Sequence, residues 1–251
     1  MTTLLIDTDI VAYRLAAVSE TDTAFGKTVD DLGDVCLQAD SVIAGLVEKL
    51  NATDVIMCLS DKQNFRYDVL PTYKSNRKGV ERPELLQAVK DYLATEYNSR
   101  GYPYLEADDV MGILATHDHA VSGRKIIVSE DKDMRTIPCE LYAPHRPELG
   151  VITISELDAD RFLMWQTICG DSTDGYKGVL GVGKTSEWAK DVIAADREDL
   201  WEEVLCAYAS KKLTETDALQ QVRVARILRA EDFNIKTKEI TLWQPELLMN
   251  R

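Results

Sequence analysis

Acidic residues follow several short apolar runs of this sequence, and carboxylates in that position can do chemistry. The acids after the first three such runs are Asp7, Asp61, and the pair Asp131 and Asp133; two further clusters hold Glu106, Asp108 and Asp109, and Asp171 and Asp174. In an α/β protein the ligand site lies at the carboxyl ends of the strands, where such acids can converge. Because two carboxylates about 4 Å apart repel by roughly 4 kcal/mol even at an effective dielectric near 20, we expect divalent metal ions among them. Metal ions held by carboxylates alone suit phosphate chemistry.

The elements that would position these acids alternate between strands and helices. Apolar runs predict strands at Thr3–Ile6, Asp54–Leu59, Tyr102–Leu105, Arg124–Val128, Leu141–Ala143, Val151–Ile154 and Ile235–Trp243. Helical spacing and capping signals predict helices at Ile10–Val18, Val35–Leu50, Pro83–Tyr97, Ala107–His117, and from the capping residue Ser155 to Cys169. This alternation predicts an α/β fold with a mainly parallel central sheet flanked by helices. Beyond about residue 160 the pattern is almost entirely helical.

A basic segment follows the second predicted strand. Residues 62–82 contain six basic and two acidic residues, although the whole chain of 251 residues has a net charge of −14. The bases are Lys62, Arg66, Lys74, Arg77, Lys78 and Arg82. A basic segment beside an acidic, metal-loaded cleft is compatible with a phosphodiester substrate, whereas charge alone favours the simpler interpretation of a solvated loop. A loop this long in a compact domain is usually functional or mobile.

The sequence GVLGVGKT at residues 178–185 matches the phosphate-binding loop pattern GxxxxGK[ST]. That motif needs a buried strand immediately before it, and residues 170–177 are too polar and too rich in glycine to form one. We therefore favour two helices joined by a glycine hairpin, whose backbone N–H groups can hold a DNA phosphate. A purely structural corner between two helices is the alternative.

Other classes of site are disfavoured. No run of about 18 apolar residues predicts a membrane span, and the N-terminal residues lack the features of a signal peptide. The five cysteines are scattered without a CxxC pair, and the three histidines have no metal-ligand spacing. These patterns argue against a zinc site or a disulfide framework and indicate a reducing cytosol.

Six motifs are spaced along the chain: Asp7, Asp61-Lys-Gln-Asn-Phe-Arg66, Tyr73-Lys-Ser-Asn-Arg77, Glu106-Ala-Asp-Asp109, Ser129-Glu-Asp-Lys-Asp133 and Gly170-Asp-Ser-Thr-Asp-Gly175. In order and spacing they resemble the flap endonuclease / 5′-nuclease superfamily, and most of all the 5′→3′ exonucleases of short-tailed bacteriophages. The resemblance implies a PIN-like metal-dependent nuclease domain at residues 1–160, with an arch or clamp at residues 62–97. Residues 161–251 would form a DNA-binding region with a helix–hairpin–helix and C-terminal helices.

The same resemblance implies two divalent metal ions, normally Mg²⁺, with Mn²⁺ as a substitute. One ion would be held, directly or through water, by Asp7, Asp61, Glu106, Asp108 and Asp109, and the other by Asp131, Asp133, Asp171 and Asp174. Asp7 and Asp61 are thereby expected to be catalytic, because the ions would activate water and stabilise the attacking and leaving oxygens. A K⁺ ion is implied at the helix–hairpin–helix.

The resemblance also implies contacts to DNA. Lys74 and Arg77 would act in catalysis by clamping the scissile or an adjacent phosphate, and Tyr73 would stack on a terminal base. Further DNA-binding residues are expected to be Arg14, Arg66, Lys78, Gly181, Gly183 and Lys184.

Four residues depart from the family pattern. Thr8 follows the first aspartate and Lys132 separates two later aspartates, at positions where glycine is common in the family. Asp9 and Glu130 add acids next to expected metal ligands. These departures bear on the fine geometry of the site rather than on the presence of a metal centre.

We therefore expect a 5′→3′ exodeoxyribonuclease that releases 5′-phosphorylated products from duplex DNA, with flap endonuclease and RNA-primer removal activity in phage DNA replication or recombination. The expected substrates are DNA with 5′ ends or flaps and RNA–DNA hybrids. The expected form is a monomer in the cytoplasm of an infected bacterium, with replication or single-strand-binding proteins as partners. The alternatives are a structure-specific DNA-binding protein without catalysis, a compact PIN-type RNase, and a phosphate-loop NTPase.

Overall fold

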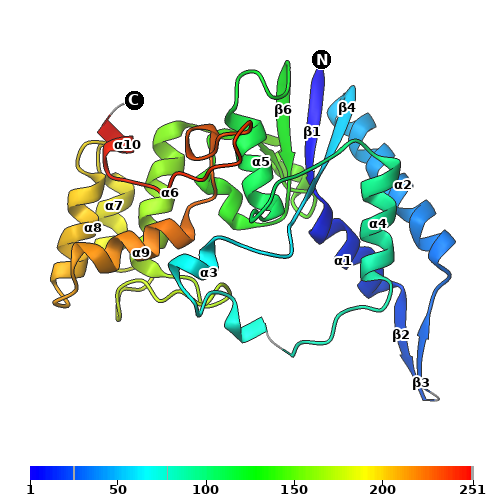
Figure 1. Ribbon diagram of the computed structural model, residues 1–251, viewed down its shortest axis with the longest axis horizontal. Coiled ribbons are helices and arrows are strands. Elements are labelled where there is room, and N and C mark those ends of the chain that lie inside the picture. The colour runs from blue at the N-terminus through cyan, green and yellow to red at the C-terminus, as the bar shows by residue number, and fades with distance from the viewer. Residues whose placement is uncertain (25, 78, 250–251) are drawn as a thin grey trace. The chain divides into compact units, whose positions relative to one another are not determined.

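The computed structural model describes residues 1–24, 26–77 and 79–249, and Figure 1 shows its elements. The chain divides into two compact units that interleave along the sequence. The first unit contains residues 1–63, 80–131 and 139–152, and the second contains residues 64–79, 132–138 and 153–251. Two short internal segments therefore group with the second unit, although they lie inside the predicted first domain.

A six-stranded sheet forms the centre of the first unit, in the order β5-β4-β1-β6-β7-β8. Its strands are β1 (Thr2–Asp7), β4 (Asp54–Leu59), β5 (Ser99–Gly101), β6 (Arg124–Val128), β7 (Cys139–Tyr142) and β8 (Val151–Ile154). The pairs β1–β4, β1–β6, β4–β5 and β6–β7 are parallel. Leu4, Leu5 and Ile6 of β1 are fully buried, as expected for a central parallel strand that is covered on both faces. The predicted mainly parallel sheet is confirmed.

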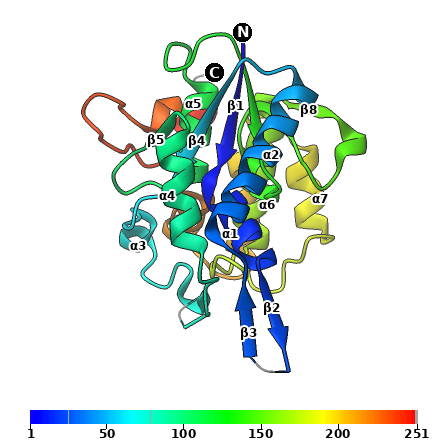
Figure 2. The same ribbon diagram turned by 90° about the vertical axis from the view of Figure 1, so that its right-hand side faces the viewer.

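Helices cover both faces of this sheet (Figures 1 and 2). On one face α1 (Thr8–Val18), α2 (Leu32–Leu50) and α4 (Leu86–Glu96) pack their apolar side chains against alternate residues of β1 and β6. Across the sheet, α5 (Ala107–Thr116) contacts β1, β4 and β6. The long amphipathic α2 is the helix that the spacing of apolar residues predicted.

Helices and short 3₁₀ turns build the second unit. They are α3 (Arg66–Val69), η1 (Ser75–Arg77), η2 (Lys132–Thr136), α6 (Glu156–Cys169), α7 (Glu187–Ala194), α8 (Leu200–Ala209), α9 (Glu215–Ala225), η4 (Ala230–Asp232) and α10 (Glu246–Met249). α6 contacts α7, α8 and α9, and their apolar core includes Leu163, Trp201 and Val222. Among the residues that the structure describes, no helix of either unit is long and apolar enough to cross a membrane.

Several predicted boundaries agree with the structure. β4, β6 and β8 have the predicted bounds. α6 ends at Cys169 as predicted, and its N-cap is Ser155, whose side chain accepts a hydrogen bond from the Asp158 N–H. A capping side chain and a buried apolar run are local signals, so sequence alone locates such boundaries.

Two predicted strands were wrong. The strand predicted at Tyr102–Leu105 lies instead at Ser99–Gly101, because the backbone turns at Tyr104, where φ is +63°. The strand predicted at Ile235–Trp243 is reduced to one isolated antiparallel bridge at Ile240, because the chain folds into a tight turn there.

Other elements differ from the prediction. The hairpin of β2 (Glu20–Thr23) and β3 (Gly26–Val29) was not predicted, and its mostly polar strands offer no apolar alternation. It extends beyond the end of α1 in Figures 1 and 2. The helix predicted from Pro83 begins at Leu86 instead. A further 3₁₀ turn, η3 (Pro147–Leu149), precedes β8.

Candidate active site

Three neighbouring parallel strands bring acids to one edge of the first unit's sheet. Asp7 is the last residue of β1, Asp61 follows β4, and Asp131 follows β6. The register aligns Ile6 with both Met57 and Val128, so these strands end at nearly the same level. We call Asp7, Asp61, Glu106, Asp108, Asp109 and Asp131 the first cluster.

Asp7 is a buried carboxylate that also caps a helix. Its Oδ1 accepts hydrogen bonds from the backbone N–H groups of Asp9 at 2.8 Å and Ile10 at 3.2 Å, which start α1. Burial, and to a smaller extent the charges of Asp9 and Asp131, raises the pKa of Asp7 to about 7, although the two backbone hydrogen bonds act in the opposite direction. A buried carboxylate with acidic neighbours is a place where a bound cation would be stabilised.

Asp61 connects the end of β4 to the loop before α5. Its Oδ1 accepts from the Lys62 N–H at 2.7 Å and its Oδ2 accepts from the Tyr104 N–H at 2.8 Å. Next to it, Ser60 Oγ accepts from the Ala107 N–H at 2.9 Å. These bonds hold the first turn of α5 at the carboxyl edge of the sheet.

The first turn of α5 carries three acids with different roles in the fold. Glu106 is the N-cap, and the buried Asp109 completes a capping box by accepting from the Glu106 N–H at 3.1 Å. Asp109 therefore stabilises the helix start. Asp108 is half-buried. Burial raises the pKa of the Cys58 thiol, and the charges of Asp7 and Asp108 add smaller increases. Both carboxylates therefore lie near this thiol.

Asp131 begins the segment after β6. Its backbone N–H donates to Ser129 Oγ at 3.1 Å, and its charge acts on Asp7. Asp131 was expected to bind the second ion, but the structure places it beside Asp7, an expected ligand of the first. The neighbouring acid Glu130 forms an ion pair with Arg14. A DNA phosphate would therefore have to compete with Glu130 for the Arg14 guanidinium. Asp9, whose role the sequence left open, pairs with Lys90 of α4.

Three more predicted ligands, Asp133, Asp171 and Asp174, lie together in the second unit, and we call them the second cluster. Lys132 Nζ donates to Asp133 Oδ1 at 2.9 Å and forms an ion pair with Asp171 Oδ2. Gln166 Nε2 also donates to Asp133 Oδ1, at 2.7 Å. Burial alone would raise the pKa of Asp171, but the hydrogen bonds from Lys132 and from the Thr173 N–H lower it below its ordinary value.

The basic segment meets the second cluster at Asp174. Arg77 Nη2 lies 2.6 Å from Asp174 Oδ1, and Lys74 Nζ lies 3.9 Å from Asp174 Oδ2. The Lys74 N–H donates to the Asp174 carbonyl at 2.8 Å, and Tyr73 Oη donates to Asp174 Oδ2 at 3.2 Å. The two predicted phosphate-clamping residues are thus brought to one of the predicted metal ligands.

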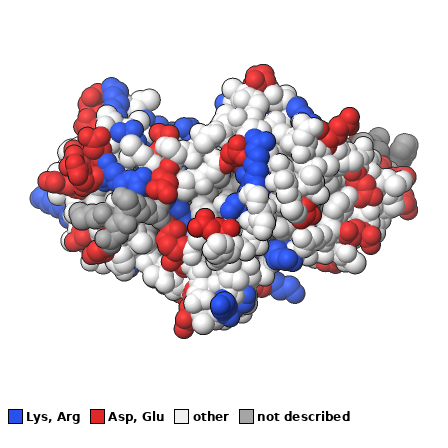
Figure 3. Space-filling view, turned by 90° about the horizontal axis from the view of Figure 1, so that it is seen from above, with Lys and Arg blue, Asp and Glu red and all other residues white. Residues whose placement is uncertain are grey.

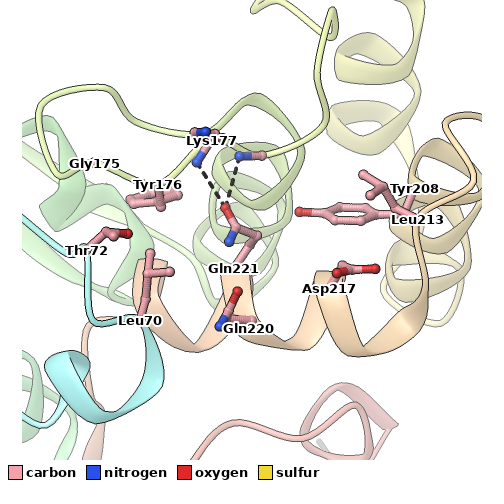
Figure 4. A pocket seen from close by; sticks show the side chains of 11 residues that line it. Leu70, Thr72, Gly175, Tyr176, Lys177, Tyr208, Leu213, Asp217, Gln220 and Gln221 are labelled. Atoms are coloured by element: carbon pink, nitrogen blue, oxygen red, sulfur yellow. Dashed lines mark hydrogen bonds between the residues drawn. The ribbon is translucent and has the colours of Figure 1, made fainter.

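A glutamine that sequence reasoning missed holds the loop between these acids and the glycine hairpin. Gln221 Oε1, on α9, accepts from the N–H groups of Lys177 at 3.1 Å and Gly178 at 3.0 Å (Figure 4). Gly178 has φ +59°, and a Cβ there would lie 2.4 Å from the backbone N of Gly170, so only glycine fits. A cavity of about 290 Å³ lies beside this contact, lined by Thr72, Asp217 and Gln221 among others. No local motif marks Gln221, because its partners are more than 40 residues away in sequence.

The predicted glycine hairpin lies between α6 and α7. Val179 and Val182 are buried, while Leu180 between them is 82% exposed. Gly181 has φ +83°, and Lys184 Nζ lies 5.9 Å from the centre of the Trp165 ring. The residues before Gly178 form a turn with an isolated bridge rather than a strand. The phosphate-loop interpretation therefore lacks the structural context it requires.

Two of the predicted DNA-binding side chains are buried. Arg66 is 2% exposed, and its guanidinium donates to the Val224 carbonyl at 2.9 Å and the Arg226 carbonyl at 2.6 Å, so it stabilises the end of α9 instead of facing DNA. The Tyr73 ring is 3% exposed and belongs to the core of the second unit, which contradicts the prediction that it stacks on a base. Lys78, also predicted to bind DNA, lies outside the described residues.

The donors of the first cluster suit a hard divalent cation, although they do not form a closed cage. Within the described part of the chain, no group of three or more His, Cys, Asp or Glu side chains is arranged to hold a metal ion by itself. Mg²⁺ usually keeps several waters and takes one or two carboxylates plus substrate phosphates. Its requirements are therefore compatible with the crowded carboxylates around Asp7.

Comparisons with known proteins show which family and which solved fold this chain resembles. Residues 2–142 match the family described as "5'-3' exonuclease, N-terminal resolvase-like domain". The chain is 34% identical to the "Exonuclease" of Escherichia phage T7 over 76% of this chain and 74% of that protein. It is 33% identical to the "Exodeoxyribonuclease" of Enterobacteria phage T3 over 76% of this chain and 73% of that protein. The T5 D15 protein co-crystallized with metal ions has a similar fold, with a TM-score of 0.62 and 17% identity over 90% of this chain and 89% of that one.

Proposed function

Because the chain belongs to the 5′-3′ exonuclease family with a resolvase-like N-terminal domain, we propose that it hydrolyses phosphodiester bonds of DNA from 5′ ends. The observation that carries this proposal is the edge of the sheet where β1, β4 and β6 each end near an acid, at Asp7, Asp61 and Asp131. Phosphodiester hydrolysis needs a polarised phosphate and an activated water, and carboxylate-bound divalent ions supply both when present.

The two clusters divide the task of binding cations. In our proposal Asp7, Asp61, Asp108 and Asp131 hold one divalent ion with Glu106, directly or through water, while Asp109 acts mainly through the helix cap. Asp133, Asp171 and Asp174 provide the ligands for a second. Mg²⁺ is the proposed physiological ion and Mn²⁺ a substitute, since both take oxygen ligands. A K⁺ ion at the glycine hairpin is part of the same proposal.

The chain's own cations would position the phosphate. Arg77 is 51% exposed at its side chain and Lys74 is 13% exposed, so Arg77 is the more accessible of the two. Both would exchange Asp174 for the phosphate oxygens, which the Arg77 guanidinium can bind as a fork and the Lys74 ammonium as a point charge. Arg14 would contribute only if it leaves Glu130.

The glycine hairpin would hold the DNA backbone. The exposed backbone around Gly181 and Gly183, together with the exposed Lys184, offers donors to phosphate oxygens without reading bases. Duplex DNA with 5′ ends or flaps is the proposed substrate, and 5′-phosphorylated nucleotides are the proposed products. RNA–DNA hybrids, a monomeric state, replication partners and a role in phage DNA replication complete the proposal.

End-labelled DNA tests this function. Linear duplex carrying a label at either the 5′ or the 3′ end is incubated with Mg²⁺, with Mn²⁺, and with a chelator, beside a 5′-flap substrate and an RNA–DNA hybrid. We expect early release of the 5′ label as short 5′-phosphorylated products, retention of the 3′ label, and no cleavage with chelator. Intact DNA with every divalent ion, or release of the 3′ label first, would contradict the proposal.

A further inference from the structure

Lys132 stands between two expected metal ligands in the sequence, Asp131 and Asp133. In the second unit its ammonium contacts two carboxylates of the second cluster at once. Nζ lies 2.9 Å from Asp133 Oδ1 and pairs with Asp171 Oδ2. The Lys132 side chain is 46% exposed, whereas those of Asp133 and Asp171 are 15% and 9% exposed. The ammonium therefore neutralises two nearly buried carboxylates from the solvent side.

Neutral donors hold these two carboxylates independently of Lys132. Gln166 Nε2, on α6, donates to Asp133 Oδ1 at 2.7 Å. The Thr173 N–H donates to Asp171 Oδ1 at 2.7 Å. If the Lys132 ammonium is removed, these donors still position the two carboxylates, but the cation that both of them contact is gone. Two such carboxylates are the ligands that a hard divalent ion prefers.

We propose that Lys132 is a built-in counter-ion of the second cluster, which a divalent ion has to displace in order to bind at Asp133 and Asp171. This inference rests on the proposed use of the second cluster as a metal site. A lysine can fill this role because its ammonium is a compact point charge on a flexible four-carbon stem, and its half-exposed side chain can turn toward solvent. The second ion then binds more weakly than it would to the same carboxylates without the lysine.

Metal titration without DNA tests this competition. Mn²⁺ is titrated into the metal-free, full-length protein in about 150 mM salt, where surface charges are screened within about 8 Å, and calorimetry reports the number of ions bound and their affinities. We expect Lys132→Met to tighten binding of the weaker ion by about tenfold, because one positive charge at contact distance is removed. Lys132→Arg keeps the charge and should bind the weaker ion within about twofold of wild type.

Two further variants show whether any change belongs to the second cluster. Adding Asp171→Asn to Lys132→Met should abolish the tightening, because a ligand of the weaker site is lost. Lys211→Met, which removes an exposed lysine after α8, should leave both affinities unchanged. As a second readout, unfolding in chelator should show Lys132→Met less stable than wild type, and millimolar Mn²⁺ should restore its stability.

The outcomes separate this inference from the proposed function. Unchanged or weaker binding of the weaker ion in folded Lys132→Met, with no recovery of stability by Mn²⁺, would overturn the counter-ion role. The same tightening in Lys211→Met would also overturn it, because the effect would then come from net charge. Neither readout uses nuclease activity, so failure of the end-label assay alone would contradict the function and leave the metal competition standing.

Discussion

The electrostatic environment of Asp7 differs from that of Asp171, although both are aspartates predicted to bind metal. Burial, together with the acids Asp9 and Asp131, raises the pKa of Asp7 to about 7, whereas Lys132 lowers that of Asp171 against the effect of burial. Because folded Asp7 keeps its proton at a pH where an unfolded aspartate has lost it, its effect on stability has the opposite sign from that of a salt-bridged aspartate. Asp7 favours the metal-free folded state below about pH 4, and this contribution is lost as the pH rises toward about 7.

Asp7→Asn should therefore flatten the pH dependence of stability. In chelator, we expect the free energy of unfolding of the wild type to fall between pH 4 and pH 7 by an amount on the order of 4 kcal/mol from this residue. The variant should lose much less over that interval, because asparagine does not titrate and its side-chain oxygen can still cap α1. Urea unfolding at several pH values measures the effect. Asp31→Asn, at the N-cap of α2, is the matched control, and equal slopes in all three proteins would contradict the assignment.

The arrangement of the second cluster depends on contacts between helices and loops that are distant in sequence. α9 supplies Gln221, which accepts two backbone N–H groups of the loop after Tyr176. α6 supplies Gln166, which donates to Asp133. The basic segment is tied to the same turn through Lys74 and Asp174. Gln166 and Lys74 thus contact residues that are expected to bind metal, whereas Gln221 holds the backbone of the loop that follows them.

Replacing Gln221 by leucine should loosen the loop between Asp171 and the glycine hairpin. Two N–H groups lose their acceptor, so we expect a loss of about 1–3 kcal/mol in the free energy of unfolding, with faster hydrogen exchange at the amides of Lys177 and Gly178. Gln221→Glu keeps the acceptor oxygens and should behave nearly as wild type. Gln220→Leu is the matched control, since Gln220 bonds to the Val69 carbonyl instead. Equal exchange rates in the two leucine variants would remove the assigned role of Gln221.

The net charge of −14 makes binding of DNA a problem of charge distribution over the entire chain. Figure 3 shows described Lys and Arg side chains lying beside Asp and Glu on the face seen from above. Several bases are already paired with acids, including Arg14 with Glu130 and Arg77 with Asp174. DNA phosphates must therefore compete with the protein's own carboxylates for these basic side chains. We expect divalent ions bound to those carboxylates to shift this competition toward the phosphates.

Affinity for duplex DNA should consequently depend strongly on salt. We expect binding in Ca²⁺, used to support binding with little cleavage, to weaken linearly in log K against log salt, with a slope of about −0.9 for each phosphate neutralised. Lys184→Gln should reduce the magnitude of the slope by about 1, the change expected when one phosphate contact is lost. Fluorescence anisotropy between 50 and 200 mM salt measures it. Lys211→Gln should keep the wild-type slope, and a Lys184→Gln slope equal to wild type would exclude a phosphate contact at the hairpin.

Local sequence was sufficient for several strands of the sheet, for the helix capped at Ser155 and for the acids that follow strands. The bounds of β4, β6 and β8 follow from short apolar runs, and α6 from its cap at Ser155, because burial periodicity and capping act within a few residues. The acids Asp7, Asp61 and Asp131 could be assigned to one edge for the same reason, since parallel strands end together. The six motifs also indicate the family, because their order and spacing are properties of the sequence.

Only the tertiary structure decided which charged side chains are available. Arg66, Arg77 and Lys132 look alike in sequence, yet Arg66 is buried beneath α9, Arg77 is half-exposed beside Asp174, and Lys132 bridges two carboxylates. The burial and pairing of these side chains depend on partners that are tens of residues away in sequence, except for the bond from Lys132 to its neighbour Asp133. Pairing and burial are properties of chain segments packed together, and periodicity along one segment does not contain them.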